Sequence, residues 1–289
     1  MSRKLGLCLM LCILFLTDVA VQAQEAASTV HQPPKVLVVV RESMKPGRGG
    51  SPHEKTESAF VAAFSAAKWP THYLAMDSQT GAPRSLFFVG YPTFEAWQTD
   101  NMNTQKNATL AAALDKASIG DGENLSGIET STFVYREDMS LNPGVDIPHM
   151  RYMELSLFHV RPGHEGEWSQ LVKAYQEAYK NIPDAHWAAY QNNYGQLGDG
   201  SYLVITPMKS ASEIDKGFGD SKKVMDAMGA EGMKKLGEQA AAAIESSQTN
   251  LFLFNPTLSY VGDDWKKADP FWQTTSATPK KKAETKPKQ

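Results

Sequence analysis

Hydrophobic and polar positions along this chain form short apolar runs that alternate with amphipathic stretches. Residues 36–40 are all apolar, which is typical of a buried strand. Residues 168–179 carry large apolar side chains at every third or fourth position, which predicts a helix with one buried face. Segments 78–83 and 195–200 are rich in Gly, Ser, Pro and Asp and predict turns between strands. The pattern therefore predicts a mixed α+β protein.

The order of these patterns occurs twice along the chain. Each matching pair of segments is separated by about 116 residues, and the pairs keep the same order in both copies. Identity between the copies is low, so the preserved order carries the inference. The four pairs are Pro46-Gly47 with Pro162-Gly163, residues 69–73 with 182–187, residues 88–92 with 203–207, and residues 132–135 with 251–254.

Each copy predicts the order strand, helix, strand, strand, helix, strand, which is the ferredoxin-like plan. Both helices then cover one face of the sheet, and the other face must be buried against a partner. We therefore expect tandem ferredoxin-like βαββαβ repeats, at 35–140 and 148–262, packed sheet to sheet as an α+β barrel within one chain. Residues 263–273 contain Trp265, Phe271 and Trp272 in a polar context, so we expect them to dock as a strap, with a partner-binding patch as the alternative.

Tandem units with a Pro-Gly turn between the first strand and the first helix resemble the dimeric α+β barrel superfamily. The resemblance covers roughly residues 35–262 and is topological. That superfamily includes antibiotic-biosynthesis-type monooxygenases that need no cofactor, haem-degrading and haem-using proteins, and uncharacterised relatives. The resemblance implies two sheets packed face to face, an arrangement that is often formed between two chains.

The N-terminus is typical of a secretory signal peptide. Arg3 and Lys4 precede an apolar run at 5–17, and small residues favour cleavage before Gln24. The run is shorter than the ~20 residues that span a bilayer, which disfavours an uncleaved anchor. We therefore expect a signal peptide at 1–23, a linker at 24–34, and a periplasmic or secreted protein without a membrane span. The Lys-rich segment 274–289 has no large apolar residue and predicts a disordered tail.

Cysteine content and charge exclude several classes of function. Cys8 and Cys12 are the only cysteines, and both lie in the signal peptide, so the mature chain has no thiol nucleophile or Cys-ligated metal. A large secreted protein without disulfides favours a bacterial source. The net charge is −3 although both ends are positive, so the body is acidic and nucleic acid is not expected as a partner. No metal-binding, phosphate-binding or nucleophile motif is present, so we expect no cofactor and no metal. Oligomerisation is possible but is not required.

Strand periodicity identifies four candidate ligand-binding residues: His72, Met76, His186 and Tyr190. Residues two apart share one face of a strand, so His72 and Met76 share a face, as do His186 and Tyr190. The repeat places a histidine at matching positions of both copies. If these faces point between the sheets, the two imidazoles line one cavity. The alternative is that both are strand-start histidines that bond to neighbouring backbone.

Three functions are compatible with this sequence. The first is a non-catalytic exported protein that binds a small apolar or aromatic ligand between the repeats. The second is a monooxygenase-like enzyme without a cofactor, with His72 or His186 as the base. The third is a haem-binding protein that uses a histidine as iron ligand. No local signature demands catalysis, so ligand binding is the leading hypothesis.

Overall fold

The computed structural model describes residues 30–198 and 200–273, so the predicted signal peptide and Lys-rich tail lie outside the described residues. The N-terminal half contains β1 (Val36–Met44), α1 (Ser51–Ala67), β2 (Tyr73–Ser78), β3 (Arg84–Tyr91), α2 (Phe94–Lys106), α3 (Ala108–Gly122) and β4 (Leu125–Tyr135). The C-terminal half contains β5 (Tyr152–Val160), α4 (Glu165–Tyr179), β6 (Ala188–Tyr194), β7 (Ser201–Met208), α5 (Ser212–Ala243) and β8 (Ile244–Phe254), followed by α6 (Asp263–Ala268). Short 3-10 turns occupy Glu137–Met139, Ile147–His149 and Pro270–Trp272.

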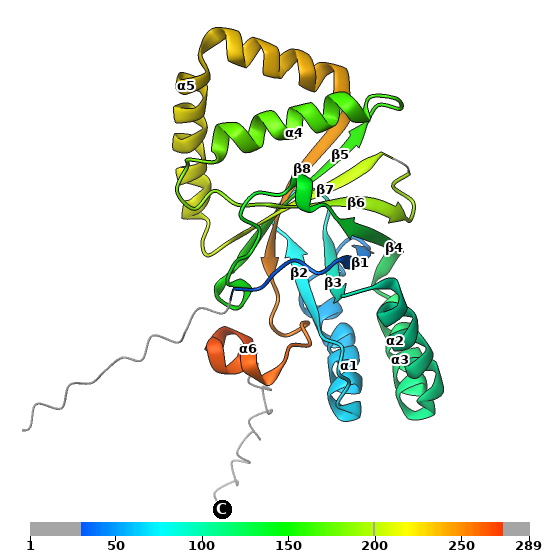
Figure 1. The fold of residues 1–289 in the computed structure, drawn as a ribbon. Coiled ribbons are helices and arrows are strands. Elements are labelled where there is room, and N and C mark those ends of the chain that lie inside the picture. The colour runs from blue at the N-terminus through cyan, green and yellow to red at the C-terminus, as the bar shows by residue number, and fades with distance from the viewer. Residues whose placement is uncertain (1–29, 199, 274–289) are drawn as a thin grey trace, which may run out of the picture.

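The strands form one closed barrel in the order β1-β3-β2-β8-β5-β7-β6-β4 (Figure 1). All neighbouring strands are antiparallel. The two halves meet at two seams, where β2 pairs with β8 and β4 pairs with β6. The prediction of an α+β barrel within one chain is confirmed at this level. Closure leaves no free strand edge in the barrel, because each edge strand of one half hydrogen-bonds to the other half.

The helices cover the outside of the barrel in two groups. In Figure 1, α1, α2 and α3 lie on one side and α4 and α5 on the opposite side. Between β3 and β4 the chain forms two helices, α2 and α3, where the sequence predicted one. Asn107 interrupts the helical segment and caps α3, because its side chain accepts a hydrogen bond from the Leu110 amide at 3.1 Å. Helix α5 bends at Gly229, whose φ of 65° is not helical.

Alternating side chains of the strands divide the core into an interior and an outer layer. Inward residues such as Leu37, Met153 and Phe252 fill the barrel. Outward residues pack beneath the helices, as Tyr202 does against Trp168 of α4. The strand pattern read from the sequence thus sets which side chains reach the barrel interior.

Residues 263–273 pack against one end of the barrel. Trp272 is 1 % exposed, and its indole N–H donates to the carbonyl of Pro148 at 2.7 Å. Asp269 forms an ion pair with Arg151 of the segment that precedes β5. The C-terminal aromatic residues are therefore part of the main core at the end of the barrel where α6 lies. None of the helices of the described residues is long and apolar enough to cross a membrane.

We predict that neither half folds alone. A fragment of residues 24–140 would expose the edges of β2 and β4 and the apolar inner face of its sheet, so it should aggregate or dimerise. The whole chain should unfold in a single transition. Light scattering of the purified fragment and urea unfolding of the full chain, followed by circular dichroism and tryptophan fluorescence, check both outcomes. A soluble, monomeric, stably folded fragment would show that the two seams are dispensable.

Candidate functional site

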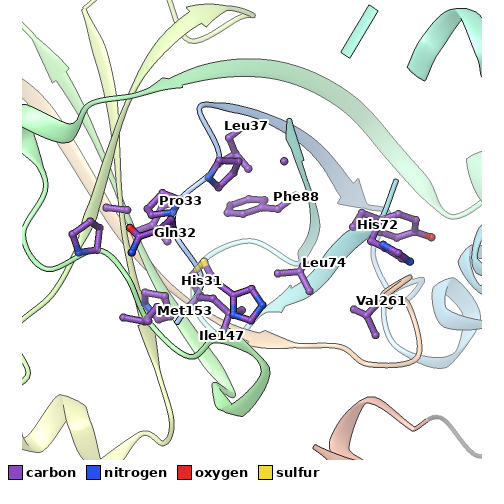
Figure 2. Close-up of a pocket in the computed structure, with 18 of the residues that line it drawn as sticks. His31, Gln32, Pro33, Leu37, His72, Leu74, Phe88, Ile147, Met153 and Val261 are labelled. Atoms are coloured by element: carbon purple, nitrogen blue, oxygen red, sulfur yellow. The ribbon is translucent and has the colours of Figure 1, made fainter. Parts of the chain in front are cut away.

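A cavity of about 420 Å³ opens at one end of the barrel (Figure 2). Its walls are inward side chains of the strands, including Leu37, Leu74 and Phe88. Three segments outside the strands complete its rim: residues 31–34, 143–147 and 261–265. The rest of the lining is also mainly apolar, so the cavity suits an apolar ligand.

Backbone hydrogen bonds hold the rim segments in place. The amide of His31 donates to the carbonyl of Val145 at 2.8 Å, and the Val145 amide donates back to His31 at 3.2 Å. On another side, Tyr73 and Tyr260 exchange a similar pair of bonds at 2.9 and 3.0 Å. Backbone bonds therefore join the rim segments to one another and to the barrel, although the rim contains little regular secondary structure.

The structure brings three of the four predicted ligand-binding residues to this cavity. His72, His186 and Tyr190 all line it; the two histidines lie just before β2 and β6, and Tyr190 lies within β6. Met76 is completely buried in the barrel interior and does not line the cavity, because the neighbouring inward residue Leu74 does so. Their role in binding remains a prediction.

His72 has a free imidazole at the cavity mouth. Its ring lies against Tyr260, with 4.9 Å between the ring centres, and makes no hydrogen bond to another described residue. Partial burial lowers its pKa below the ordinary 6.5, and the nearby carboxylate of Asp264 offsets part of that effect. The ring is therefore neutral at pH 7, with a nitrogen lone pair available to a ligand.

His186 is held by the backbone on both sides. Its Nδ1 lies 2.7 Å from the carbonyl oxygen of Asp184, and its Nε2 lies 2.8 Å from that of Pro207. A neutral imidazole can donate only one of these bonds. This geometry corresponds to the strand-start alternative considered above, so the two matching histidines differ in their freedom to act on a ligand.

Tyr190 contributes a fixed wall of the cavity. Its hydroxyl donates to the carbonyl of Pro34 at 3.2 Å, and its ring packs 5.5 Å from that of Tyr135. Burial raises the pKa of Tyr190 far above the ordinary value of a phenol, so the side chain stays protonated and neutral. The residue also anchors the segment that precedes β1.

Sequence reasoning missed several residues of the rim. His31, Gln32, Asp264 and Trp265 all line the cavity. The ring of His31 meets Trp265 edge to face, with 5.2 Å between centres, so the two termini of the described chain meet at the mouth. These residues lie outside both predicted repeats, where strand periodicity gives no information. The cluster of aromatic residues at 263–273 was the one available signal.

The described lining of the cavity offers no cation to the charged groups of a haem. Asp264 is the only carboxylate among the described residues that line it, and neither lysine nor arginine is among them. The two propionates of haem would therefore meet a like charge and no cation. His186 is also unavailable as an iron ligand unless its backbone bonds break.

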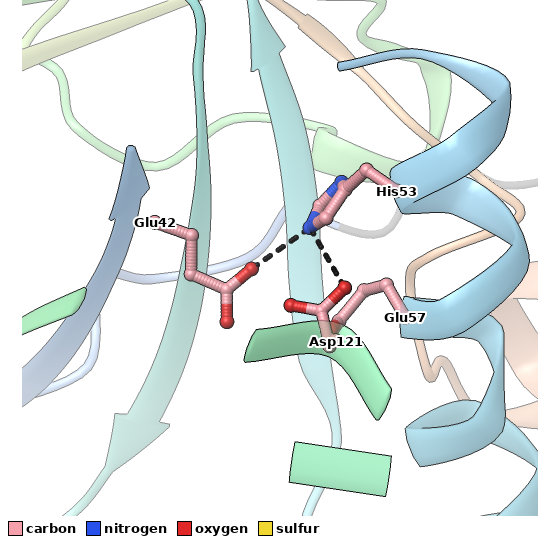
Figure 3. Close-up of side chains that lie close together, drawn as sticks. All are labelled: Glu42, His53, Glu57 and Asp121. Carbon is pink, nitrogen blue, oxygen red and sulfur yellow. Dashed lines mark hydrogen bonds and ion pairs between the residues drawn. The ribbon is translucent and has the colours of Figure 1, made fainter. Parts of the chain in front are cut away.

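A second group of polar side chains lies outside the barrel, beneath α1 (Figure 3). Glu42, His53, Glu57 and Asp121 are all buried, and one potential metal-ligand atom from each lies within 4.8 Å of the others. We expected no metal site from the sequence. The available signal was the spacing of His53 and Glu57, which places both on one helix face at i and i+4. Glu42 and Asp121 are distant in sequence and could not be added without the fold.

Comparison with known proteins supports the architecture. Neither a protein-family model nor a curated protein matches the sequence. An anthrone oxidase-like protein superimposes with a TM-score of 0.51 at 12 % identity, over 76 % of this chain and 91 % of that one. The chain has the dimeric α+β barrel fold. A candidate monooxygenase from Fusobacterium nucleatum has a TM-score of 0.49 at 11 % identity, over 78 % of this chain and 94 % of that one. A mutant chlorite dismutase from Candidatus Nitrospira defluvii has a TM-score of 0.45 at 8 % identity, over 83 % of this chain and 98 % of that one.

The dimeric α+β barrel fold agrees with the resemblance inferred from the sequence. In this chain the barrel is closed by the seams between its own halves. The cavity lies inside that closed barrel and takes residues from both halves, as the positions of His72 and His186 show.

The two cavity histidines should separate stability from binding. We expect His186→Ala to lower the free energy of unfolding by about 1–3 kcal/mol, because the imidazole that lies between the carbonyls of Asp184 and Pro207 is removed. His72→Ala should change it by less than about 0.5 kcal/mol, since this ring makes no hydrogen bond to the described chain. Urea unfolding of the two variants measures the difference. Equal losses would mean that the rings are not held as differently as their contacts indicate.

Proposed function

We propose that the protein binds a small aromatic molecule in the barrel-mouth cavity. The observation that carries this proposal is the apolar cavity of about 420 Å³ with a few polar groups at its rim. Its size lies within the ~300–1,000 Å³ typical of small-molecule sites. Phe88 and Trp265 offer ring surfaces for contact with an aromatic ligand, and Gln32 and His72 can bond to a hydroxyl or carbonyl group.

A second function, oxidation of the bound molecule, is favoured by the free imidazole of His72. A neutral histidine in an apolar cavity can remove a proton from a carbon that is acidified by neighbouring rings and a carbonyl. The resulting carbanion can transfer electrons to molecular oxygen directly. In the overall reaction a CH₂ group and O₂ give a C=O group and water, so no further reductant is needed. The name of the anthrone oxidase-like structure is consistent with such a substrate.

His72 is the base in this proposal, and His186 and Tyr190 are positioning residues. Both nitrogens of His186 face backbone carbonyls, so this ring holds the cavity wall and does not exchange a proton with the ligand. Tyr190 remains protonated because burial raises its pKa. The structure therefore favours one asymmetric base over the symmetric pair that the sequence suggested.

Export and internal duplication remain proposals of their own. Export rests on the three-part pattern of residues 1–23, and a periplasmic or secreted location follows from it. Duplication rests on the sequence pairs and is supported by the strand pairing, since β1 pairs with β3 and β4 as β5 pairs with β7 and β8. Under this proposal the ligand would be met outside the cytoplasm.

Binding can be tested by filling the cavity. Leu74→Trp should weaken binding of a bicyclic phenol such as 2-naphthol at least tenfold, because the larger ring occupies the cavity that Leu74 lines. Ile119→Trp, at a position that is 77 % exposed on α3, is the matched control and should bind as the wild type does. Fluorescence titration measures both. Equal affinity of the two variants would place the ligand elsewhere.

Oxidation can be tested with anthrone and dissolved oxygen. Wild-type protein should consume oxygen faster than the spontaneous reaction, and His72→Ala should remove the acceleration while still binding 2-naphthol. The pKa of His72 is lowered, so its neutral form persists below pH 6.5, and the rate should fall only at lower pH. Unchanged oxygen consumption in His72→Ala would exclude the base. A Soret band in the purified protein would instead support the haem alternative.

A further inference from the structure

The four polar side chains beneath α1 come from three elements and converge on one point. Glu42 lies on β1, His53 and Glu57 on α1, and Asp121 on α3. Their side chains point toward one another in Figure 3. The Nε2 atom of His53 is 2.9 Å from Glu42 Oε2 and 3.7 Å from Asp121 Oδ1. The cluster is separate from the barrel-mouth cavity, because Glu42 faces outward from the strand.

Two carboxyl oxygens of the cluster have no hydrogen-bond partner among the described residues. Glu57 is 4 % exposed and Asp121 is 1 % exposed. Their Oε2 and Oδ2 atoms have no hydrogen-bond partner within the part of the chain that the structure describes, and neither does the buried hydroxyl of Tyr73. Such unpaired buried oxygens are costly and call for a missing partner. Two of them belong to carboxyl groups at the centre of the cluster.

Three carboxyl groups share this buried space with a single imidazole. Among the described residues, the cluster therefore holds more potential negative charge than positive charge, which is costly in a buried place.

In the C-terminal half, the corresponding space between β5 and α4 is filled by apolar residues. Glu42 is the seventh residue of the nine in β1, and Phe158 is the seventh of nine in β5. The first buried residue of α1 is His53, and that of α4 is Trp168, which packs 5.2 Å from Phe158. The fold therefore does not require polar residues at this place.

We propose that Glu42, His53, Glu57 and Asp121 bind a divalent transition-metal ion. The ligand atoms lie within 4.8 Å of one another, close to the ~4 Å between opposite ligands of an ion held at ~2.0–2.2 Å, so a small contraction completes the site. Three carboxylates and one imidazole favour Mn²⁺, Fe²⁺ or Zn²⁺, because Mg²⁺ and Ca²⁺ prefer oxygen ligands alone.

The surroundings already fix one of the ligands. Thr56 donates from Oγ1 to Asp121 Oδ1 at 2.6 Å, and Asn124 donates to Thr56 at 2.9 Å. Such outer bonds orient a carboxylate and leave its second oxygen free for the ion. Residues 45–50, which join β1 to α1 and so connect the elements that carry Glu42 and His53, are exposed.

Thermal unfolding of the full mature chain, refolded with Mn²⁺, Zn²⁺ or Mg²⁺ alone, tests the site. Saturating Mn²⁺ or Zn²⁺ should raise the Tm by about 5 °C or more, with Zn²⁺ effective at the lower concentration. Mg²⁺ at the same concentrations should have little effect. Stabilisation by Mg²⁺ equal to that by Zn²⁺, or the absence of stabilisation by Mn²⁺ and Zn²⁺, would overturn the proposal.

Glu57→Gln tests the ligands themselves. Glutamine has the shape of the protonated carboxyl, so this variant should fold without metal and lose most of the metal-dependent rise in Tm. Glu154→Gln is the matched control, because burial raises the pKa of Glu154, which lies on β5, outside the cluster. It should keep the full rise. If both variants respond as the wild type does, the ion binds elsewhere and the assignment is wrong. Zinc bound per chain, measured by elemental analysis after gel filtration, should fall from one in the wild type to near zero in Glu57→Gln.

Discussion

Closure of the barrel by hydrogen bonds between β2 and β8 and between β4 and β6 is the constraint on which the rest of the structure depends. Each half has an inner sheet face that water would meet if the other half were absent. Closing both seams buries these faces as one interior and fixes the register of all strands together. The cavity then arises at the end of the barrel where inward side chains stop and the chain continues into irregular segments.

The same closure explains why the cavity takes its polar groups from distant parts of the sequence. His72 and His186 lie just before β2 and β6, and each of these strands pairs across a seam with the other half. The barrel topology places both histidines at the rim, but it does not determine which hydrogen bonds each imidazole makes. His186 sits between two carbonyls, whereas His72 lies against Tyr260 and makes no hydrogen bond to another described residue. An approximate symmetry of backbone thus supports two different chemical roles.

Much of this could be predicted from the sequence because strands have a strict period of two. The period placed His72 with Met76, and His186 with Tyr190, on shared faces. In the structure, Met76 and Tyr190 belong to the core of the barrel interior, and His72 and His186 line the cavity. The strand period could not predict that Met76 lies deeper in the barrel than the cavity, because the depth of the cavity depends on where the rim segments cross the end of the barrel. The rim itself and the cluster of Glu42 with Asp121 depend on tertiary contacts between residues far apart in the chain, which no local pattern encodes.

The buried cluster also bears on how the two halves are stabilised. In the C-terminal half, Phe158, Trp168 and Leu236 fill the space between the strands and the helices. Their apolar contacts stabilise the fold without a bound ion or a change of protonation. In the N-terminal half, the corresponding space holds carboxylates whose burial costs free energy unless a cation offsets it. Packing of α1 and α3 on β1 therefore depends on what occupies the cluster, whereas packing of α4 and α5 on β5 does not. Because the seams couple the halves, the proposed metal ion would stabilise the whole barrel through the packing of α1 and α3 on β1.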